Sequence, residues 1–448
     1  MCKLSEIFIL DYKENFEEIL IEYNLEKKPV SVDFKKLVDS VKFTERATHS
    51  IHTYTAKLIP NIPYYFFNNS FFVSDRAKVL DPFCGSGTVL LEAKLAGLNS
   101  FGSDANPLAR LITRVKCNNY DISKLENIKN RLKKDLGNVT SVHNFIGNKS
   151  FDFWFEKHIQ VQLASIKEVV SNIKEVKYQE FYLLCFSNCV RKVSKADSRI
   201  SVPVKLNPDR YADGSKLKIS SLKKLDELKS ISVFDKFFEI VDQNIKRVEN
   251  KSFISNYRQV GKLVSEDSRN LTPLRDNSID LILTSPPYAG AQKYIRASSL
   301  NLYWLGYNSL GELDKLNIGR ENYKKDEYKA LKKTDIKSAD YLLQKIFDKN
   351  PLRAYIAANY ILEMAEAFKE SARVLKKNKY LVLVASNNVV CNYEFRTQEY
   401  LKEIILKLGF TLECEMVDDI KSYGLMTKRN KTASIISSEH ILIFKKNG

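Results

Sequence analysis

Apolar residues along the chain follow two patterns, short runs and longer runs at helical spacing. The short runs are typical of buried strands, and they lie at 77–80, 100–103, 260–264, 279–283, 380–385, 410–416 and 439–444. Apolar positions three and four residues apart predict helices, at 16–25, 89–96, 163–173, 178–193, 300–305, 352–375 and 399–408. Because strands alternate with helices, we expect an α/β fold with a mostly parallel sheet.

Two long segments interrupt this alternation. Residues 105–256 combine helical patterns with a stretch rich in Pro, Asn, Asp and Gly, and 289–350 hold one aromatic helix and a charged tail. The organisation that we expect is an N-terminal helical extension at 1–48, an α/β domain at 49–119 and 255–448, and a second insertion at 289–350 within that domain. An inserted helical and basic region at 120–254 is the candidate for DNA recognition.

The charge of the chain favours a polyanionic partner. Its 448 residues include 71 Lys and Arg against 54 Asp and Glu, a formal net charge of +17. Residues 186–262 hold 17 Lys and Arg against 9 Asp and Glu, so the excess is concentrated there. A solvated basic surface is the simpler explanation of charge alone, and only motifs can decide between the two.

Other features of the composition exclude several protein classes. No apolar run approaches the roughly 20 residues of a membrane-spanning helix, and the N-terminus lacks the layout of a signal peptide. The seven cysteines are odd in number and scattered, which argues against a disulfide framework. We therefore expect a soluble, cytoplasmic protein without membrane association.

A glycine loop follows the first strand of the α/β pattern. The loop reads Asp81-Pro-Phe83-Cys-Gly85-Ser-Gly87 and leads into a helix. Two glycines let a ligand lie against the backbone, and free N–H groups at the helix start face it. The third glycine of a dinucleotide fingerprint would fall at Leu90, which disfavours NAD. Asp104 ends the next strand, where a carboxylate can bind both hydroxyls of a ribose, so the context favours a nucleoside ligand over an ordinary turn.

A second motif, Ser285-Pro286-Pro287-Tyr288, follows the buried strand at 279–283. Two prolines fix the backbone and remove two donors. The loop is then rich in acceptors and an aromatic ring follows it, which suits an exocyclic amine on a stacked planar base. A rigid turn with a packed tyrosine is the alternative for this motif alone.

Together the two motifs resemble those of the S-adenosylmethionine-dependent amino-methyltransferases of DNA. The Ser-Pro-Pro-Tyr form resembles the cytosine-N4 branch, because the adenine-N6 branch more usually carries Asp or Asn first. Segments 49–67 and 294–306 also resemble bacterial modification methylases, and the resemblance covers roughly 49–110 and 255–445. It implies a Rossmann-like methyltransferase sheet with one antiparallel strand, S-adenosylmethionine as the cofactor, and a catalytic role for the α/β domain.

The resemblance also implies roles for individual residues. Asp104 would bind the ribose and Asp267 the adenine amine, within a cofactor-binding set of Thr55, Lys57, Asp81, Phe83, Gly85, Gly87, Asp104, Asp267 and Ser268. The catalytic set that would hold the target base is Ser285, Pro286, Pro287 and Tyr288. Cytosine N4 would attack the methyl group directly, so no cysteine nucleophile is needed. No metal site is expected, and Cys185 and Cys189 are interpreted as core residues.

The implied partner is double-stranded DNA, with a cognate restriction endonuclease acting on the same site. The insertions do not match any of the family's usual motif orders cleanly, so the DNA-reading insertion stays open. Candidate phosphate contacts are Arg191, Lys192, Lys195, Arg199, Lys205, Arg210, Lys428 and Arg429.

Three alternatives stay open at this point. Adenine-N6 methylation of DNA needs a similar pocket, because both targets are exocyclic amines. RNA methylation and a catalytically inactive nucleic-acid-binding protein are the others, although the intact Ser-Pro-Pro-Tyr motif argues against the inactive protein. The recognition sequence and the oligomeric state do not follow from the sequence.

Overall fold

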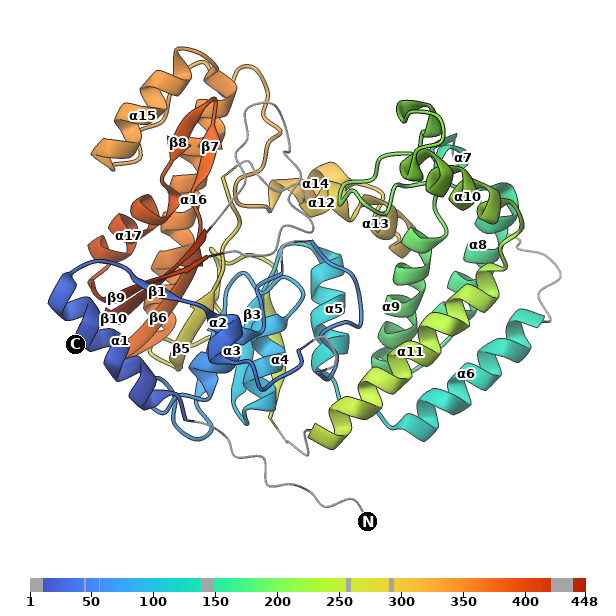
Figure 1. The fold of residues 1–448 in the computed structure, drawn as a ribbon, viewed down its shortest axis with the longest axis horizontal. Coiled ribbons are helices and arrows are strands. Elements are labelled where there is room, and N and C mark those ends of the chain that lie inside the picture. The colour runs from blue at the N-terminus through green and yellow to red at the C-terminus, as the bar shows by residue number, and fades with distance from the viewer. Residues whose placement is uncertain are drawn as a thin grey trace.

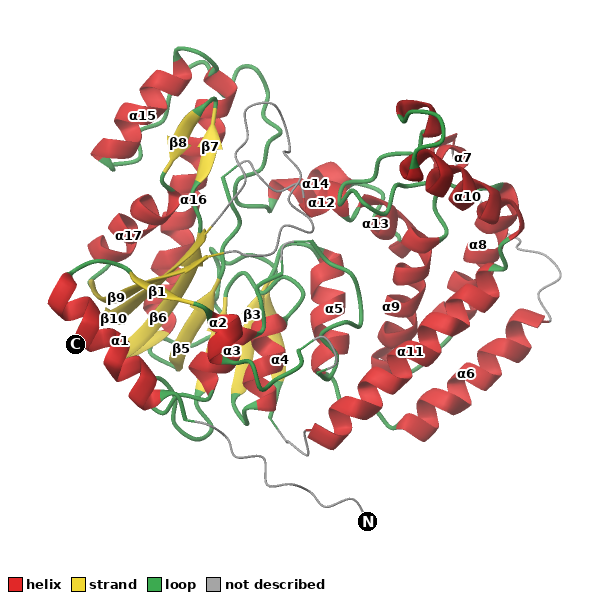
Figure 2. Ribbon diagram, in the orientation of Figure 1, coloured by secondary structure: helices red, strands yellow, loops and turns green. Residues whose placement is uncertain are grey.

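One eight-stranded sheet forms the centre of the chain (Figures 1 and 2). The computed structural model describes residues 11–43, 46–55, 57–137, 149–254, 259–289, 294–419 and 438–448. In sheet order the strands are β1 (Val30–Val32), β9 (Phe410–Asp419), β10 (Ser438–Lys446), β6 (Leu375–Ala385), β5 (Ile279–Thr284), β2 (Lys78–Asp81), β3 (Asn99–Ser103) and β4 (Gly261–Ser265).

Strand direction confirms the expected Rossmann-like sheet. Within the described strands of the eight-stranded sheet, β10 alone runs antiparallel, against both β6 and β9. The chain leaves β2 towards β3 and β4 on one side, then returns to β5 and continues to β6 on the other. The strand order therefore reverses between β2 and β5. In open α/β sheets, ligands bind at the carboxyl ends of the strands at such a point.

The seven strands predicted from apolar runs all occur. The strands that the pattern missed are β1, β7 (Asn388–Val390) and β8 (Tyr393–Phe395), and each has only three residues. A run that short carries too little periodicity to be recognised. β1 pairs with β9, so the segment expected as an N-terminal helical extension also supplies an edge strand to the central sheet.

Helices cover both faces of the sheet. One face packs on α1 (Lys13–Glu26), α2 (Phe34–Leu37), α3 (Asn61–Phe67) and α4 (Thr88–Leu95). The other packs on α15 (Lys337–Phe347), α16 (Pro351–Val374) and α17 (Thr397–Lys407). Val79 and Leu80 of β2 point into opposite cores, as the two-residue period of a strand requires.

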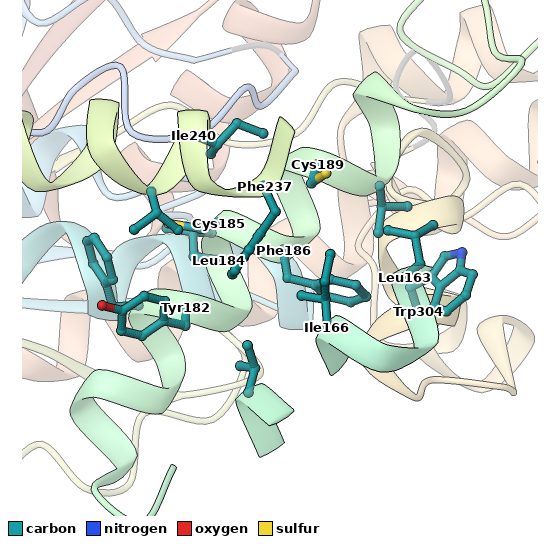
Figure 3. Packing of buried hydrophobic residues seen from close by; sticks show 14 of the residues in the cluster. Leu163, Ile166, Tyr182, Leu184, Cys185, Phe186, Cys189, Phe237, Ile240 and Trp304 are labelled. Carbon is teal, nitrogen blue, oxygen red and sulfur yellow. The ribbon is translucent and has the colours of Figure 1, made fainter. Parts of the chain in front are cut away.

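The inserted helical region stands beside the sheet, next to α5 (Pro107–Cys117) (Figure 1). It consists of α6 (Ile122–Gly137), α7 (Lys149–Trp154), α8 (Lys157–Ser171), α9 (Val176–Lys192), the short 3-10 helix at Pro208–Arg210, α10 (Lys216–Ser230) and α11 (Val233–Ile254). These helices enclose a core of their own, in which Phe186 and Phe237 are fully buried. Cys185 and Cys189 lie in this core, as interpreted from the sequence (Figure 3).

The second insertion shares that core. Its helices are α12 (Tyr294–Ala297), α13 (Ser299–Leu305) and α14 (Leu310–Lys315). Trp304 of α13 packs among Leu163, Ile166 and Phe186 (Figure 3), with its ring centroid 6.0 Å from that of Phe186. The two insertions are therefore parts of one hydrophobic unit. Among the described helices, none is long and apolar enough to cross a membrane.

Candidate active site

The glycine loop and the Ser-Pro-Pro-Tyr motif follow neighbouring strands, β2 and β5. The hydroxyl of Thr284, the last residue of β5, donates a hydrogen bond of 2.6 Å to Asp81 Oδ1. The backbone N–H of Phe83 donates to the same oxygen at 3.1 Å. Burial raises the pKa of Asp81 to about 7, and these two hydrogen bonds partly oppose that rise. Asp81 thus connects the glycine loop to the end of β5, directly before the Ser-Pro-Pro-Tyr motif.

The glycine loop needs glycine at both positions. Gly85 and Gly87 have φ angles of +51° and +72°, a region that other residues rarely adopt. A Cβ atom on Gly87 would also lie 2.7 Å from Thr113 Oγ1. Thr113 donates its hydroxyl hydrogen to the carbonyl of Gly85 at 3.0 Å, so α5 supports the loop from below. α4 begins at once after Gly87.

A single pocket lies where these loops meet, and it brings together residues from both motifs. Its wall includes, from the predicted sets, Phe83, Gly85, Asp104, Asp267, Ser268, Ser285 and Pro287. The predicted residues that are not part of the wall are Thr55, Lys57, Asp81, Gly87, Pro286 and Tyr288. Cofactor candidates and base candidates therefore share one cavity.

Asp104 holds the backbone on two sides of the pocket. Its carboxylate accepts hydrogen bonds from the backbone N–H of Gly85 and of Asn106, both at 2.8 Å. Burial raises the pKa of Asp104 to about 6, against the lowering effect of these bonds. A carboxylate has about four acceptor positions, so this one retains capacity for the hydroxyls of a ribose.

Asp267 is tightly held by a neighbour that the sequence did not single out. Arg269 donates from Nε to Asp267 Oδ1 at 2.9 Å and from Nη2 to Oδ2 at 2.9 Å. The hydroxyl of Ser265 accepts a hydrogen bond from the backbone N–H of Asp267 at 3.0 Å. The carboxylate is thereby fixed in orientation at the wall of the pocket.

Lys57 is directed to the chain itself. Its ammonium donates to the carbonyl of His52 at 2.8 Å, and burial lowers its pKa to about 8. The neighbouring Thr55 is half-buried in the same segment. Neither Thr55 nor Lys57 lines the pocket, but Tyr54 of the same segment does.

Several wall residues were missed by sequence reasoning. Tyr54 and Asn106 are joined by a hydrogen bond of 3.2 Å from Asn106 Nδ2 to the tyrosine hydroxyl. Asn106 precedes Pro107 and accepts from the N–H of Leu108, so its helix-capping position was a readable signal. The others in the wall are Pro82, Ser103, Ala105, Glu266, Tyr294, Leu316, Asn317 and Ile318. Three of these come from the second insertion beyond α14, where no sequence pattern pointed to a site.

The predicted DNA contacts on the inserted region are largely engaged within the chain. Arg191 Nη2 donates to the carbonyl of Ile200 at 2.6 Å, and Lys195 pairs with Glu156 at 2.9 Å. Arg199 makes two bonds to Asp197, of 2.8 and 2.7 Å.

The remaining predicted contacts are more open to solvent. The ammonium of Lys205 lies 4.5 Å from the ring centroid of Phe153, Lys192 is half-buried, and Arg210 is exposed. Lys428 and Arg429 lie outside the described residues.

The pocket fits S-adenosylmethionine in its chemistry. Asp104 and Asp267 present carboxylate oxygens, which are the acceptors that the hydroxyls of a ribose and the amine of an adenine require, and Phe83 and Ile318 present apolar surface. Within the described residues, no group of three or more His, Cys, Asp or Glu is arranged to hold a metal ion.

Comparison with known proteins also indicates similarity to methyltransferases. Residues 51–145 match the family model of the RMKL-like methyltransferase domain. The type II methyltransferase M.MvaI of Kocuria varians is 24% identical over 90% of this chain and 92% of its own length. M.MjaII of Methanocaldococcus jannaschii is 32% identical over 45% of this chain and 39% of its own.

A solved S-adenosylmethionine-dependent methyltransferase from Methanosarcina mazei is 10% identical, with a TM-score of 0.30, over 88% of this chain and 99% of its own. The family model and the relatives agree in one respect: this chain is similar to methyltransferases, and over 90% of its length to a type II methyltransferase.

Proposed function

We propose that the chain methylates the exocyclic N4 amine of cytosine at a specific site in double-stranded DNA, in a restriction-modification system. The observation that carries the proposal is the presence of Ser285 and Pro287 in the same pocket wall as Phe83 and Asp104. An amine held by the Ser-Pro-Pro-Tyr loop would face a cofactor held by the glycine loop. The type II methyltransferases similar to this chain support DNA as the substrate.

The residues of the β5 loop would prepare the amine for attack. The lone pair of cytosine N4 is conjugated with the ring, which makes the nitrogen a poor nucleophile. Hydrogen bonds donated by the amine to the hydroxyl of Ser285 and the carbonyl of Pro286 would draw the nitrogen towards tetrahedral geometry and free the lone pair. The rest of the rate enhancement would come from placing two substrates in line.

The cofactor, when bound, supplies an electrophilic methyl group. The chain's own contribution is to hold it: Asp104 at the ribose, Asp267 at the adenine, and the backbone of Gly85 at close range. Tyr288 would stack on the target base once the base leaves the duplex, which costs a few kcal/mol. Stacking on an aromatic ring contributes about 1–3 kcal/mol and offsets part of that cost.

The inserted helical region would hold the duplex. Arg210 is exposed, and Lys205 lies over the ring of Phe153, which is 49% exposed. Cations beside exposed aromatic rings suit contacts with phosphates and sugars. Arg191, Lys195 and Arg199, which are bonded within the chain, would instead stabilise the loop that carries Lys205 and Arg210.

The test is the methylated nucleoside itself. Plasmid DNA is incubated with the protein and S-adenosylmethionine carrying a labelled methyl group, then digested and separated by chromatography. Label in N4-methylcytosine supports the proposal. Label in N6-methyladenine would replace cytosine with adenine as the target, and label in RNA alone would exclude DNA. A protein that binds DNA but transfers no label to either nucleic acid would overturn the enzyme assignment.

A further inference from the structure

Behind Asp267, a chain of contacts connects the pocket to the second insertion. Arg269 contacts Asp267 on one side and Glu363 of α16 on the other, with Nη1 3.4 Å from Glu363 Oε1. The other oxygen of Glu363 accepts a hydrogen bond of 3.2 Å from the backbone N–H of Gly319. One glutamate thus contacts both the arginine that holds Asp267 and the segment 316–319.

Segment 316–319 forms part of the pocket wall. Leu316, Asn317 and Ile318 all line the cavity. Ile318 is only 8% exposed and belongs to the same hydrophobic core as Tyr360 and Met364 of α16. Gly319 has a φ of +76°, so the chain turns there immediately after the wall residues. The segment is therefore fixed on α16 by one apolar and one polar contact.

The Arg269 fork leaves Asp267 able to bind a further donor. The backbone N–H and Nε of Arg269 both reach Oδ1, at 2.9 Å each. Oδ2 receives Nη2 at 2.9 Å and a longer contact from Nε at 3.1 Å. Since each carboxylate oxygen offers about two acceptor positions and the Nε contact is shared, Oδ2 retains capacity for one more N–H.

We propose that Arg269 and Glu363 are positioning residues for the nucleoside end of the cofactor. Arg269 aims the carboxylate of Asp267 at the adenine amine, and Glu363 holds both Arg269 and the wall segment 316–319. The inference rests on the proposed function, in which Asp267 accepts the adenine amine. Neither positioning residue is part of the pocket wall, so both would act through their neighbours.

The two residues have separable effects on binding. Arg269 acts through Asp267, so its replacement weakens the hydrogen bond from the 6-amino group of adenine to Asp267. The protein would then discriminate less between adenine and hypoxanthine. Glu363 also acts through segment 316–319, which lines the pocket whatever group stands at position 6. Its loss therefore weakens both kinds of nucleoside.

The experiment is calorimetric titration with S-adenosylhomocysteine and S-inosylhomocysteine, without DNA. In Arg269→Lys, which keeps the charge but loses the planar fork, we expect affinity for the adenosyl compound to fall about tenfold and that for the inosyl compound by less than about threefold. In Glu363→Gln we expect both affinities to fall together, by about threefold or more. The ratio of the two affinities is independent of the folded fraction, so partial unfolding cannot imitate the first result.

The matched control is Glu366→Gln. Glu366 is exposed on the same helix, and its charge acts on Arg269 without a direct contact. Equal effects of Glu363→Gln and Glu366→Gln would overturn the role of Glu363, and an unchanged ratio in Arg269→Lys would overturn that of Arg269. A wild-type protein that binds neither compound would instead refute the proposed function on which both roles depend.

Discussion

Thr284 donates its hydroxyl hydrogen to Asp81 across two adjacent strands, over 2.6 Å. Each residue is the last of its strand: Asp81 begins the glycine loop, and Thr284 directly precedes the Ser-Pro-Pro-Tyr motif. Thr284 is completely buried and Asp81 is 3% exposed, so water cannot replace this bond. The bond therefore sets the distance between the loop that would hold the cofactor and the loop that would hold the base.

Removal of this hydroxyl is expected to destabilise the protein. Thr284→Val keeps the shape but leaves a buried carboxylate without one donor, which costs about 1–3 kcal/mol of unfolding free energy. The pKa of Asp81 is raised to about 7 from its usual value near 3.8. Ionisation of Asp81 therefore lowers the stability of the folded state as the pH rises between these two values. The donor favours the charged form, and the loss should be larger at pH 8 than at pH 5.

Urea unfolding of wild type and Thr284→Val at both pH values measures this difference. Thr284→Ser keeps the hydroxyl and serves as the control, with a smaller loss that does not vary with pH. Equal losses at pH 5 and pH 8 in Thr284→Val would contradict the assigned partner.

Asp104 predicts a pH dependence of cofactor binding. Its pKa is raised to about 6 by burial, so it gains its charge between pH 5 and 7. Ribose hydroxyls donate more strongly to a carboxylate than to a carboxylic acid. Affinity for S-adenosylhomocysteine should thus rise with pH across this range. In Asp104→Ala we expect a loss of about 1.5–3 kcal/mol at pH 7 and a flatter profile.

Calorimetric titration between pH 5 and 7 gives both quantities. Asp121→Ala, an exposed change at the start of α6, is the control for the loss of a carboxylate elsewhere. A wild-type affinity that falls with rising pH would be incompatible with ribose binding by the Asp104 carboxylate.

Tyr288 should separate base handling from cofactor binding. In Tyr288→Ala the loss of about 1–3 kcal/mol of stacking lowers kcat/KM for DNA by about 5- to 150-fold. Affinity for S-adenosylhomocysteine should stay within about twofold, because Tyr288 is not part of the pocket wall. Methyl transfer and calorimetry measure the two effects, and Tyr288→Phe keeps the ring and most of the activity. Parallel losses of transfer and cofactor affinity would assign Tyr288 to the cofactor instead.

Two arginines of the inserted region should differ in what they do. Arg210→Gln removes an exposed charge and should reduce the slope of log K for DNA against log salt by about 0.9, the value for one phosphate contact. Arg199→Gln breaks the pair with Asp197 and should lower the melting temperature while the salt slope is retained. Fluorescence anisotropy over a salt series and thermal unfolding distinguish them. The opposite pattern would reverse these roles.

The strand–loop motifs could be recognised from sequence because their chemistry is local. Asp81, Gly85 and Gly87 follow one short strand, and Ser285 and Pro287 follow another. Parallel strands bring their carboxyl ends to one edge of the sheet. Thus two segments about 200 residues apart were expected in one site, and the pocket includes residues from both.

The partners of those residues could not be predicted in the same way. The contact of Arg269 with Glu363 joins a turn after β4 to the middle of α16, and nothing in either segment indicates the other. The partners of the basic residues at 191–210 could not be predicted for a related reason. Charge counts do not show which cations have a carboxylate or carbonyl beside them, as Arg199 and Arg191 do.

The packing of Trp304 has a consequence for exchanging parts between related enzymes. This ring comes from the second insertion but packs beside Leu163 and Phe186 of the first. A chimaera that replaced 120–254 alone would place this indole against a foreign core, in the segment that follows the Ser-Pro-Pro-Tyr motif. The two insertions therefore depend on each other for packing, and an exchange that keeps the protein folded should carry 294–306 together with the helices of 120–254.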